Sequence, residues 1–185
     1  MNDTKYANPG PLGLMGFGMT TVLLNIHNAG FYPISAMVLA MGIFYGGMAQ
    51  IVAGVLEFRK GNTFAVTAFI SYGFFWLTLV ALILMPKLGW IEATPHGFMA
   101  CFLILWGIFT VFMFIGTLKG NKALSFTFFL AAVLFFLLAA RDITGSELIG
   151  RIAGWEGILC GLSAFYLAMA EVINEQFEER LLPIG

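Results

Sequence analysis

Six long runs of apolar residues, separated by short polar breaks, dominate the pattern of this chain. A helix needs about 20 predominantly apolar residues to cross the hydrocarbon core of a bilayer. The breaks between the runs hold residues that end helices or carry charge, such as Pro33, Arg59-Lys60-Gly61 and Lys119-Gly120. The pattern therefore predicts an all-α membrane protein, a six-transmembrane-helix bundle. We place the spans at residues 12–28, 34–57, 63–85, 97–118, 123–140 and 152–173.

Composition supports a membrane location for almost the whole chain. Hydrophobic residues make up 60% of it, charged residues 10%, and the mean hydropathy is +0.92. A soluble domain carries about 25% charged residues. We therefore expect three parts: a cytoplasmic N-terminal segment (1–10), a six-helix transmembrane domain (11–175) and a cytoplasmic tail (176–185).

The basic residues predict an orientation. Loops on the cytoplasmic side of a membrane are enriched in Lys and Arg. One end of the predicted bundle receives six of them, Lys5, Arg59, Lys60, Lys119, Lys122 and Arg180, and the other end receives three, Lys87, Arg141 and Arg151. We expect a multi-pass protein of the cell (inner) membrane with both termini in the cytoplasm.

Four of the predicted helices carry one narrow stripe of polar or small side chains at helical spacing. Such faces fit a bundle around a thin, weakly polar path. The alternative is structural, because hydroxyls can bond their own backbone and amides can join helices. For Gln50 and Asn25 both interpretations stay open. The stripes are Thr21, Asn25 and Asn28; Gly46, Gln50, Ala53, Gly54 and Glu57; Thr67, Ser71, Phe74 and Thr78, with Tyr72 beside them; and Glu156, Cys160, Ser163, Leu167 and Glu171.

The stretch that enters the first span suggests an anion site. Pro9 and Pro11 lack amide hydrogens and restrict the backbone, so we expect Gly10 to be non-helical and the helix to begin at Pro11. Free amides around Gly13 and Leu14, close to Asn8, would then face a small anion. The alternative is that this helix entry only packs against its neighbours.

Candidate catalytic chemistry is sparse. His27 and His96 form no ligand set with Cys101 and Cys160, and both cysteines fall in apolar runs without metal-like spacing. No nucleophile motif and no basic cluster for nucleic acid is present. We predict a protein that is not an enzyme and has no catalytic residues, metal or cofactor.

The segment Asn8-Pro9-Gly10-Pro11-Leu12-Gly13-Leu14 resembles the signature that opens the acetate uptake transporter family, the succinate–acetate permeases of microbial membranes. The resemblance implies a path for small carboxylates, acetate above all, with one pore per protomer in a homohexamer surrounded by membrane lipid. It continues in Gly16-Phe17-Gly18-Met19-Thr20-Thr21, Ala40-Met41-Gly42-Ile43-Phe44-Tyr45-Gly46-Gly47, Gly61-Asn62-Thr63, Ser71-Tyr72-Gly73, Gly116-Thr117-Leu118 and Ala170-Glu171-Val172.

The resemblance also implies an aperture and shows one departure from the family pattern. The family narrows its pore with a Phe and a Tyr, matched here by Phe17 and Tyr72, and with a Leu on the fifth helix. Ala131 stands at that Leu position, with Leu130 and Leu134 alongside. We favour a wider pore that admits succinate more readily, the alternative being that Leu134 refills the gap.

Substrate selectivity would then come from the aperture, from the entry amides, and from side-chain donors such as Thr20, Thr21 and Gln50. One rival function is a channel for small neutral solutes such as urea or ammonia, because a hydroxyl-lined path suits them too. A second rival is a structural or accessory subunit. A channel and an alternating-access carrier both fit these features.

A path without a fixed cation would favour the neutral form of the acid, because a bare anion is costly to move into low dielectric. Uptake is then expected to rise as the external pH falls. Glu156 is a candidate proton site, placed roughly 6–10 Å inside the outer end of its helix. The alternative for Glu156 is a carboxylate at headgroup level, held by Arg151 or water.

Overall fold

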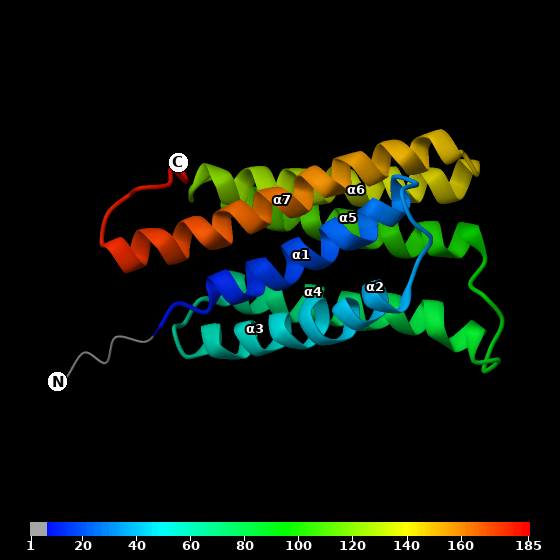
Figure 1. The fold of residues 1–185 in the computed structure, drawn as a ribbon, viewed down its shortest axis with the longest axis horizontal. Helices are drawn as coiled ribbons and strands as arrows, with labels where there is room; N and C mark the ends of the chain where they lie inside the picture. The colour runs from blue at the N-terminus through cyan, green and yellow to red at the C-terminus, as the bar shows by residue number, and fades with distance from the viewer. Residues whose placement is uncertain (1–6) are drawn as a thin grey trace.

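The computed structural model describes residues 7–185, which form an all-α bundle of six rods lying side by side (Figure 1). Three consecutive elements, α2, η1 and α3, make up the second rod, and η1 is a π-helix. The prediction of a six-helix bundle is confirmed. The elements are α1 (Gly10–Asn28), α2 (Ala36–Met41), η1 (Gly42–Ala49), α3 (Gln50–Phe58), α4 (Thr63–Lys87), α5 (His96–Thr117), α6 (Lys122–Thr144) and α7 (Glu147–Phe177).

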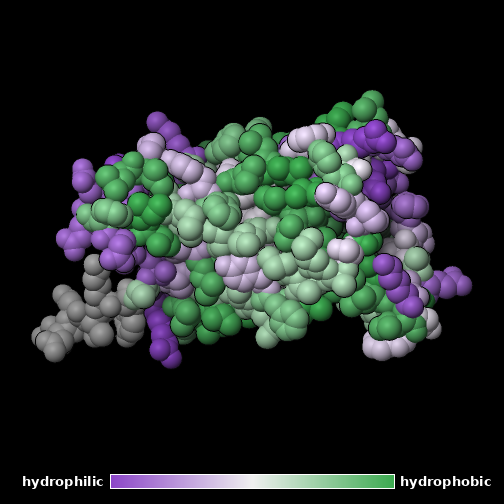
Figure 2. Space-filling view, viewed as in Figure 1, coloured by the Kyte–Doolittle hydropathy of each residue, from purple (hydrophilic) through white to green (hydrophobic). Residues whose placement is uncertain are grey.

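The surface matches a protein that spans a bilayer. In Figure 2 apolar side chains cover the middle of the bundle, and hydrophilic ones gather toward its two ends. Five rods are long and apolar enough to cross a membrane: α2 to α3, α4, α5, α6 and α7. The remaining rod, α1, carries Asn25, His27 and Asn28 in its last turn, and it packs against α7, η1 and α3.

The start of α1 and the end of α7 lie at the same end of the bundle (Figure 1), as an even number of antiparallel rods requires. We call the end that holds the start of α1 and the end of α7 the proximal end, and the opposite one the distal end. Arg59, Lys60 and Lys119 lie in turns at the proximal end, and Arg141 and Arg151 lie near the distal end. Lys5, which contributed to the predicted orientation, lies outside the described residues.

The end of α6 and the start of α7 differ from the prediction by several residues, for local reasons. The last helix begins at Glu147, earlier than the expected residue 152, because the Ser146 hydroxyl accepts a hydrogen bond from the Ile149 amide at 3.4 Å and caps it. Before it, α6 runs on to Thr144 and ends at Gly145, whose φ of +65° suits glycine. The connection between α6 and α7 is therefore only two residues long.

Close backbone approach joins α1 to α7. An ideal Cβ on Gly18 would lie 2.7 Å from the Gly161 carbonyl oxygen, and one on Gly161 would lie 2.6 Å from the Gly18 carbonyl oxygen. Neither position has room for a methyl group. These two glycines therefore let the helices meet backbone to backbone, a common device in membrane helices.

The polar stripe predicted for the third span is wrong. Thr67, Phe74 and Thr78 on α4 are exposed on the outside of the bundle. The buried face of α4 instead carries aromatic and small side chains, among them Tyr72 and Trp76, which pack into a core with α5 and α6. Exposed threonines are tolerated in apolar helices because their hydroxyls can bond their own backbone, so helical spacing alone did not reveal which face is buried.

Candidate functional site

Two cavities enter the bundle, one at each end. The proximal cavity has a volume of about 170 Å³ and the distal cavity about 280 Å³. Polar residues lining the proximal cavity are Asn8, Gln50, Glu57, Lys60, Asn62, Tyr72, Thr127 and Glu171. Those lining the distal cavity are Thr21, Asn25, His27, Asn28, Trp76, Thr94, His96, Arg141 and Asp142.

The two cavities share two wall residues, Phe17 on α1 and Ala131 on α6. The Phe17 ring lies 6.0 Å from the Tyr72 ring, measured between centroids. Phe17 also packs against a small buried cluster of Leu130, Ala131 and Cys160. The apolar neck between the cavities is therefore built from α1, α4, α6 and α7, and we call it the constriction.

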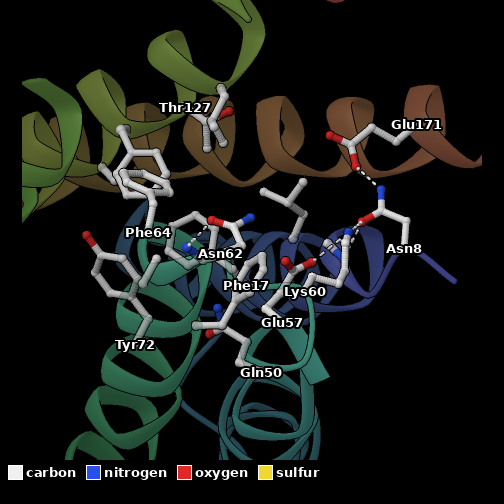
Figure 3. A pocket seen from close by; sticks show the side chains of 18 residues that line it. Asn8, Phe17, Gln50, Glu57, Lys60, Asn62, Phe64, Tyr72, Thr127 and Glu171 are labelled. Carbon is white, nitrogen blue, oxygen red and sulfur yellow. Dashed lines mark hydrogen bonds and ion pairs between the residues drawn. The ribbon is translucent and has the colours of Figure 1, made fainter. Parts of the chain in front are cut away.

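A chain of hydrogen bonds crosses the mouth of the proximal cavity (Figure 3). The Asn8 amide nitrogen donates to the Glu171 carboxylate at 3.1 Å, and the Asn8 oxygen accepts from the Lys60 ammonium at 3.0 Å. Lys60 also lies 3.4 Å from a carboxylate oxygen of Glu57, whose side chain is only 2% exposed. This arrangement fixes one cation, flanked by an amide and two carboxyl groups, at the entrance.

The wall of the proximal cavity also offers polar groups with unused hydrogen-bonding capacity. The side-chain oxygen of Gln50 and one carboxylate oxygen of Glu57 are buried without a hydrogen-bond partner among the described residues. Buried polar groups normally find a partner, in protein or water. Because both side chains line the cavity, water or a polar solute there can supply it.

Tyr72 closes the inner end of the proximal cavity in a fixed orientation. Its hydroxyl shares a hydrogen bond of 2.8 Å with the Thr110 hydroxyl on α5, which in turn donates to the Trp106 carbonyl at 2.7 Å. The Tyr72 ring also packs edge-on against Phe109. This anchoring presents the ring, and not the hydroxyl, toward Phe17 at the constriction.

The distal cavity also holds hydrogen-bonding groups near the constriction. Asn25 donates to the Thr21 carbonyl at 2.9 Å and accepts from the Asn28 amide at 3.0 Å. The Thr21 hydroxyl and the Trp76 indole N–H are buried with no partner among residues 7–185. Two donors are thus available on the wall of the distal cavity.

Charged groups stand farther out in the distal cavity. Arg141 and Asp142 of α6 both line it, and the Asp142 carboxylate lies 3.4 Å from the His96 imidazole. Each cavity therefore contains a basic side chain, Lys60 or Arg141. The expectation of a path without a fixed cation is wrong, because Lys60 in the turn after α3 and Arg141 in the last turn of α6 both reach into the cavities.

The structure brings most of the predicted site residues onto the cavity walls. Asn8, Gly10, Leu14, Gln50 and Tyr72 line the proximal cavity; Thr21, Asn25 and Leu134 line the distal one; Phe17 and Ala131 line both. Three of the predicted pore residues lie elsewhere, and Glu156, the candidate proton site, lines neither cavity. Gly13 packs against the Phe69 ring, the Thr20 hydroxyl donates to the Met41 carbonyl at 3.4 Å, and Ser71 lines a separate shallow cleft beside Trp106.

The entry of α1 differs from the expected anion site. Pro9 has a helical backbone (φ −82°, ψ −9°), so α1 begins at Gly10, one residue earlier than expected. The Gly13 amide donates to the Pro9 carbonyl at 3.3 Å, and the Gly10 amide donates to the Asn8 side chain at 3.2 Å. The expectation of a free amide at Gly13 is wrong, and the polar group offered here is the Asn8 side chain.

Glu156 lies deeper than expected. Because α7 begins at Glu147, Glu156 lies nine positions into the helix, about 14 Å from its start at the usual rise. Both of its carboxylate oxygens are buried without a partner among the described residues. The alternative in which Arg151 holds it is not seen, since neither ion pair within residues 7–185 involves Glu156.

Sequence reasoning missed the two basic residues and Trp76. Lys60 and Arg141 were counted as loop charges that set orientation, although spacing places Lys60 only three residues from Glu57, on a predicted polar stripe. Trp76 is one helical turn from Tyr72 on the same face. The four-residue spacing from Tyr72 was the signal that could have identified Trp76.

Comparisons with known proteins point to one family. The model of the GPR1/FUN34/yaaH family matches residues 1–180. The chain is 62% identical to the succinate-acetate/proton symporter SatP of Escherichia coli (strain K12), over 100% of this chain and 98% of that protein. It is 33% identical to acetate permease A of Emericella nidulans, over 98% of this chain and 66% of that one.

Two further relatives extend the comparison. The ammonia transport outward protein 2 of Saccharomyces cerevisiae is 36% identical over 93% of this chain and 64% of its own length. A solved structure of the bacterial acetate channel SatP matches with a TM-score of 0.97 and 62% identity, covering 98% of this chain and 100% of that one.

Proposed function

The chain belongs to the GPR1/FUN34/yaaH family, and from this membership we propose that it carries acetate and other small carboxylates, succinate among them, across a membrane. It is a transporter or channel, as its relatives are named, and not an enzyme. The observation that carries the proposal is the pair of cavities that enter from opposite ends and share Phe17 and Ala131.

The chemistry of the cavities suits a carboxylate. Lys60 and Asn8 stand at the proximal mouth, and Arg141 and Asn25 stand in the distal cavity. An ammonium, a guanidinium and amide N–H groups are the donors that carboxylates prefer. These groups can replace part of the water that a carboxylate loses as it enters from either side.

The constriction favours passage of the neutral acid. Phe17, the Tyr72 ring, Ala131 and Leu130 offer no charge and no free donor to an anion between the cavities. Moving a bare carboxylate through an apolar neck costs far more than moving the protonated acid. We therefore propose proton-linked uptake, in agreement with the name of the Escherichia coli relative.

The membrane, orientation and assembly are further parts of the proposal. The excess of basic residues at the proximal end supports cytoplasmic termini in the cell (inner) membrane. Large apolar side chains remain exposed along the outside, for example Leu105 and Phe112 on α5 and Leu159 on α7. Lipid and neighbouring copies would cover them, and the family resemblance supports a homohexamer.

The test is solute flux with the purified protein in liposomes. Labelled acetate should enter faster than into protein-free liposomes, and unlabelled succinate should compete. Urea and ammonia flux are measured in the same preparation, because the yeast relative is named for ammonia transport. Urea or ammonia flux without acetate flux would overturn the carboxylate proposal, and no flux of any solute would favour an accessory role.

A further inference from the structure

Glu156 occupies a defined position beside the constriction. It precedes Cys160 by four residues on α7, which is one helical turn, or about 6 Å. Cys160 is fully buried and clusters with Leu130 and Ala131 against Phe17. Glu156 therefore lies about one turn on the distal side of the constriction, well inside the bundle.

The face that carries Glu156 is turned toward α6. The Cys160 thiol lies 3.8 Å from the Thr127 carbonyl, and the Ser163 hydroxyl shares a 2.9 Å hydrogen bond with the Thr127 hydroxyl. Residues four and seven apart share one face of a helix, so Glu156 faces α6 with Cys160 and Ser163. Ala131, the shared wall of both cavities, lies on that same α6 between Thr127 and the distal end.

Among the described residues, no charged side chain forms an ion pair with the Glu156 carboxyl group. The helices packed against α7 are α1 and α6. On α1 the one titratable side chain is His27, which bonds the Tyr32 carbonyl. On α6 the nearest is Arg141, whose side chain packs at Gly150, six residues before Glu156 on α7 and thus about 9 Å along the axis. The other titratable residues of these helices are Lys122, Asp142, Glu147, Arg151, Cys160, Tyr166, Glu171 and Glu175.

The setting of this carboxyl group is unfavourable for a negative charge. Both oxygens are enclosed and lack a partner among the described residues, although the residue as a whole is only half-buried. An ionised carboxylate there would be strongly unfavourable without a cation or water. An ionised Glu156 would have to draw water to its carboxylate, and water drawn there would weaken the packing of α7 on α6.

We propose that Glu156 is a proton-binding site beside the constriction, and that loss of its proton loosens the α6–α7 interface and slows carboxylate transport. The inference rests on the proposed function in one respect, since the consequence for transport needs a carboxylate path. It goes beyond substrate chemistry, because it places part of the pH dependence in the protein itself. The acid available to permeate and the state of Glu156 then respond to pH independently.

Infrared spectroscopy tests the proton site without relying on transport. The wild-type protein in liposomes at neutral pH should show a protonated carboxylic-acid carbonyl band that is absent from Glu156→Gln. The matched control is Glu147→Gln, an exposed acid at the start of the same helix, which should leave that band unchanged. If Glu156→Gln has the same acid band as the wild type, Glu156 is ionised and the proposal is wrong.

Transport tests the consequence. Acetate uptake is measured over a pH series while the concentration of undissociated acid is kept constant. Above the pH at which the Glu156 band disappears, the wild-type rate should fall by about tenfold per pH unit, as for loss of one proton. Glu156→Gln, which mimics the protonated group, should stay flat, and Glu147→Gln should follow the wild type.

The results separate the two proposals. Identical pH profiles for wild type and Glu156→Gln, with acetate uptake intact, would overturn the gating by Glu156 and leave the carboxylate function standing. If no variant takes up acetate, the proposed function fails, and the infrared band still decides whether Glu156 binds a proton.

Discussion

Replacing Ala131 with leucine would place three more carbon atoms at the wall that the two cavities share. Ala131 is 4% exposed, lines both cavities, and lies beside Leu130 and Cys160. Leu134 lines the distal cavity alone, about 4.5 Å farther along the helix axis. This placement supports the wider pore over the alternative in which Leu134 refills the gap.

The expected size of the effect follows from pockets that distinguish apolar groups by size. One methylene group in a confined site changes discrimination by roughly 1–3 kcal/mol, or 10–200-fold. Acetate has a single methyl group beyond its carboxyl, whereas succinate must bring a longer chain and a second carboxyl through the neck. We therefore expect Ala131→Leu to lower the succinate-to-acetate uptake ratio by about tenfold, equivalent to ~1.4 kcal/mol.

The assay is competitive uptake of labelled acetate and succinate in proteoliposomes at one pH. The matched control is Ala132→Leu, because Ala132 is also buried on α6 but lines neither cavity. Overpacking at Ala132 should slow both substrates together and leave their ratio unchanged. An unchanged ratio in folded, acetate-competent Ala131→Leu protein would refute the aperture argument.

Three other substitutions probe the packing and the cavity walls. Gly161→Ala should destabilise the folded protein by about 1–3 kcal/mol, because the methyl group would lie 2.6 Å from a backbone oxygen of α1. Thermal unfolding in detergent measures the loss of stability, and Gly97→Ala, where the added methyl group meets open space, is the control. Lys60→Ala should raise the KM for acetate and lower the melting temperature, and adding Glu57→Gln should recover the melting temperature alone, since it removes the unpaired buried carboxylate. Tyr72→Phe should cost about 1 kcal/mol in unfolding free energy through its lost hydroxyl bond while changing acetate uptake little, and a large loss of uptake would show that the hydroxyl contacts the substrate.

Hydropathy was sufficient to predict the rods, because a helix that crosses a bilayer must be apolar over about 20 residues, regardless of which helices it packs against. Helix ends were less predictable, since they depend on caps such as Ser146 and on single glycines such as Gly145. The face of α4 was predicted wrongly because hydroxyls in apolar helices carry little orientational information. Ser71, which was predicted to line the path, is an example: it lies in a cleft outside both cavities.

For the cavity walls, side chains that are costly in hydrocarbon were the better guide. Asn25 and Gln50 do line the two cavities, as amides that need partners should. Lys60 and Arg141 escaped prediction because they were counted as loop charges, and a sequence does not show how far a long side chain reaches into a cavity. The meeting of Phe17 with Ala131, more than a hundred residues apart, is a tertiary contact that only the family resemblance anticipated.

The central claim is that small carboxylates pass between the two cavities at Phe17 and Ala131. Initial uptake of labelled acetate into liposomes containing Ala131→Trp tests it most directly, because an indole there should fill the constriction. The control is Phe129→Trp, an aromatic exchange at an exposed position of the same helix. We predict that wild type and Phe129→Trp take up acetate and that folded Ala131→Trp does not; acetate uptake by Ala131→Trp at the wild-type rate would contradict the account.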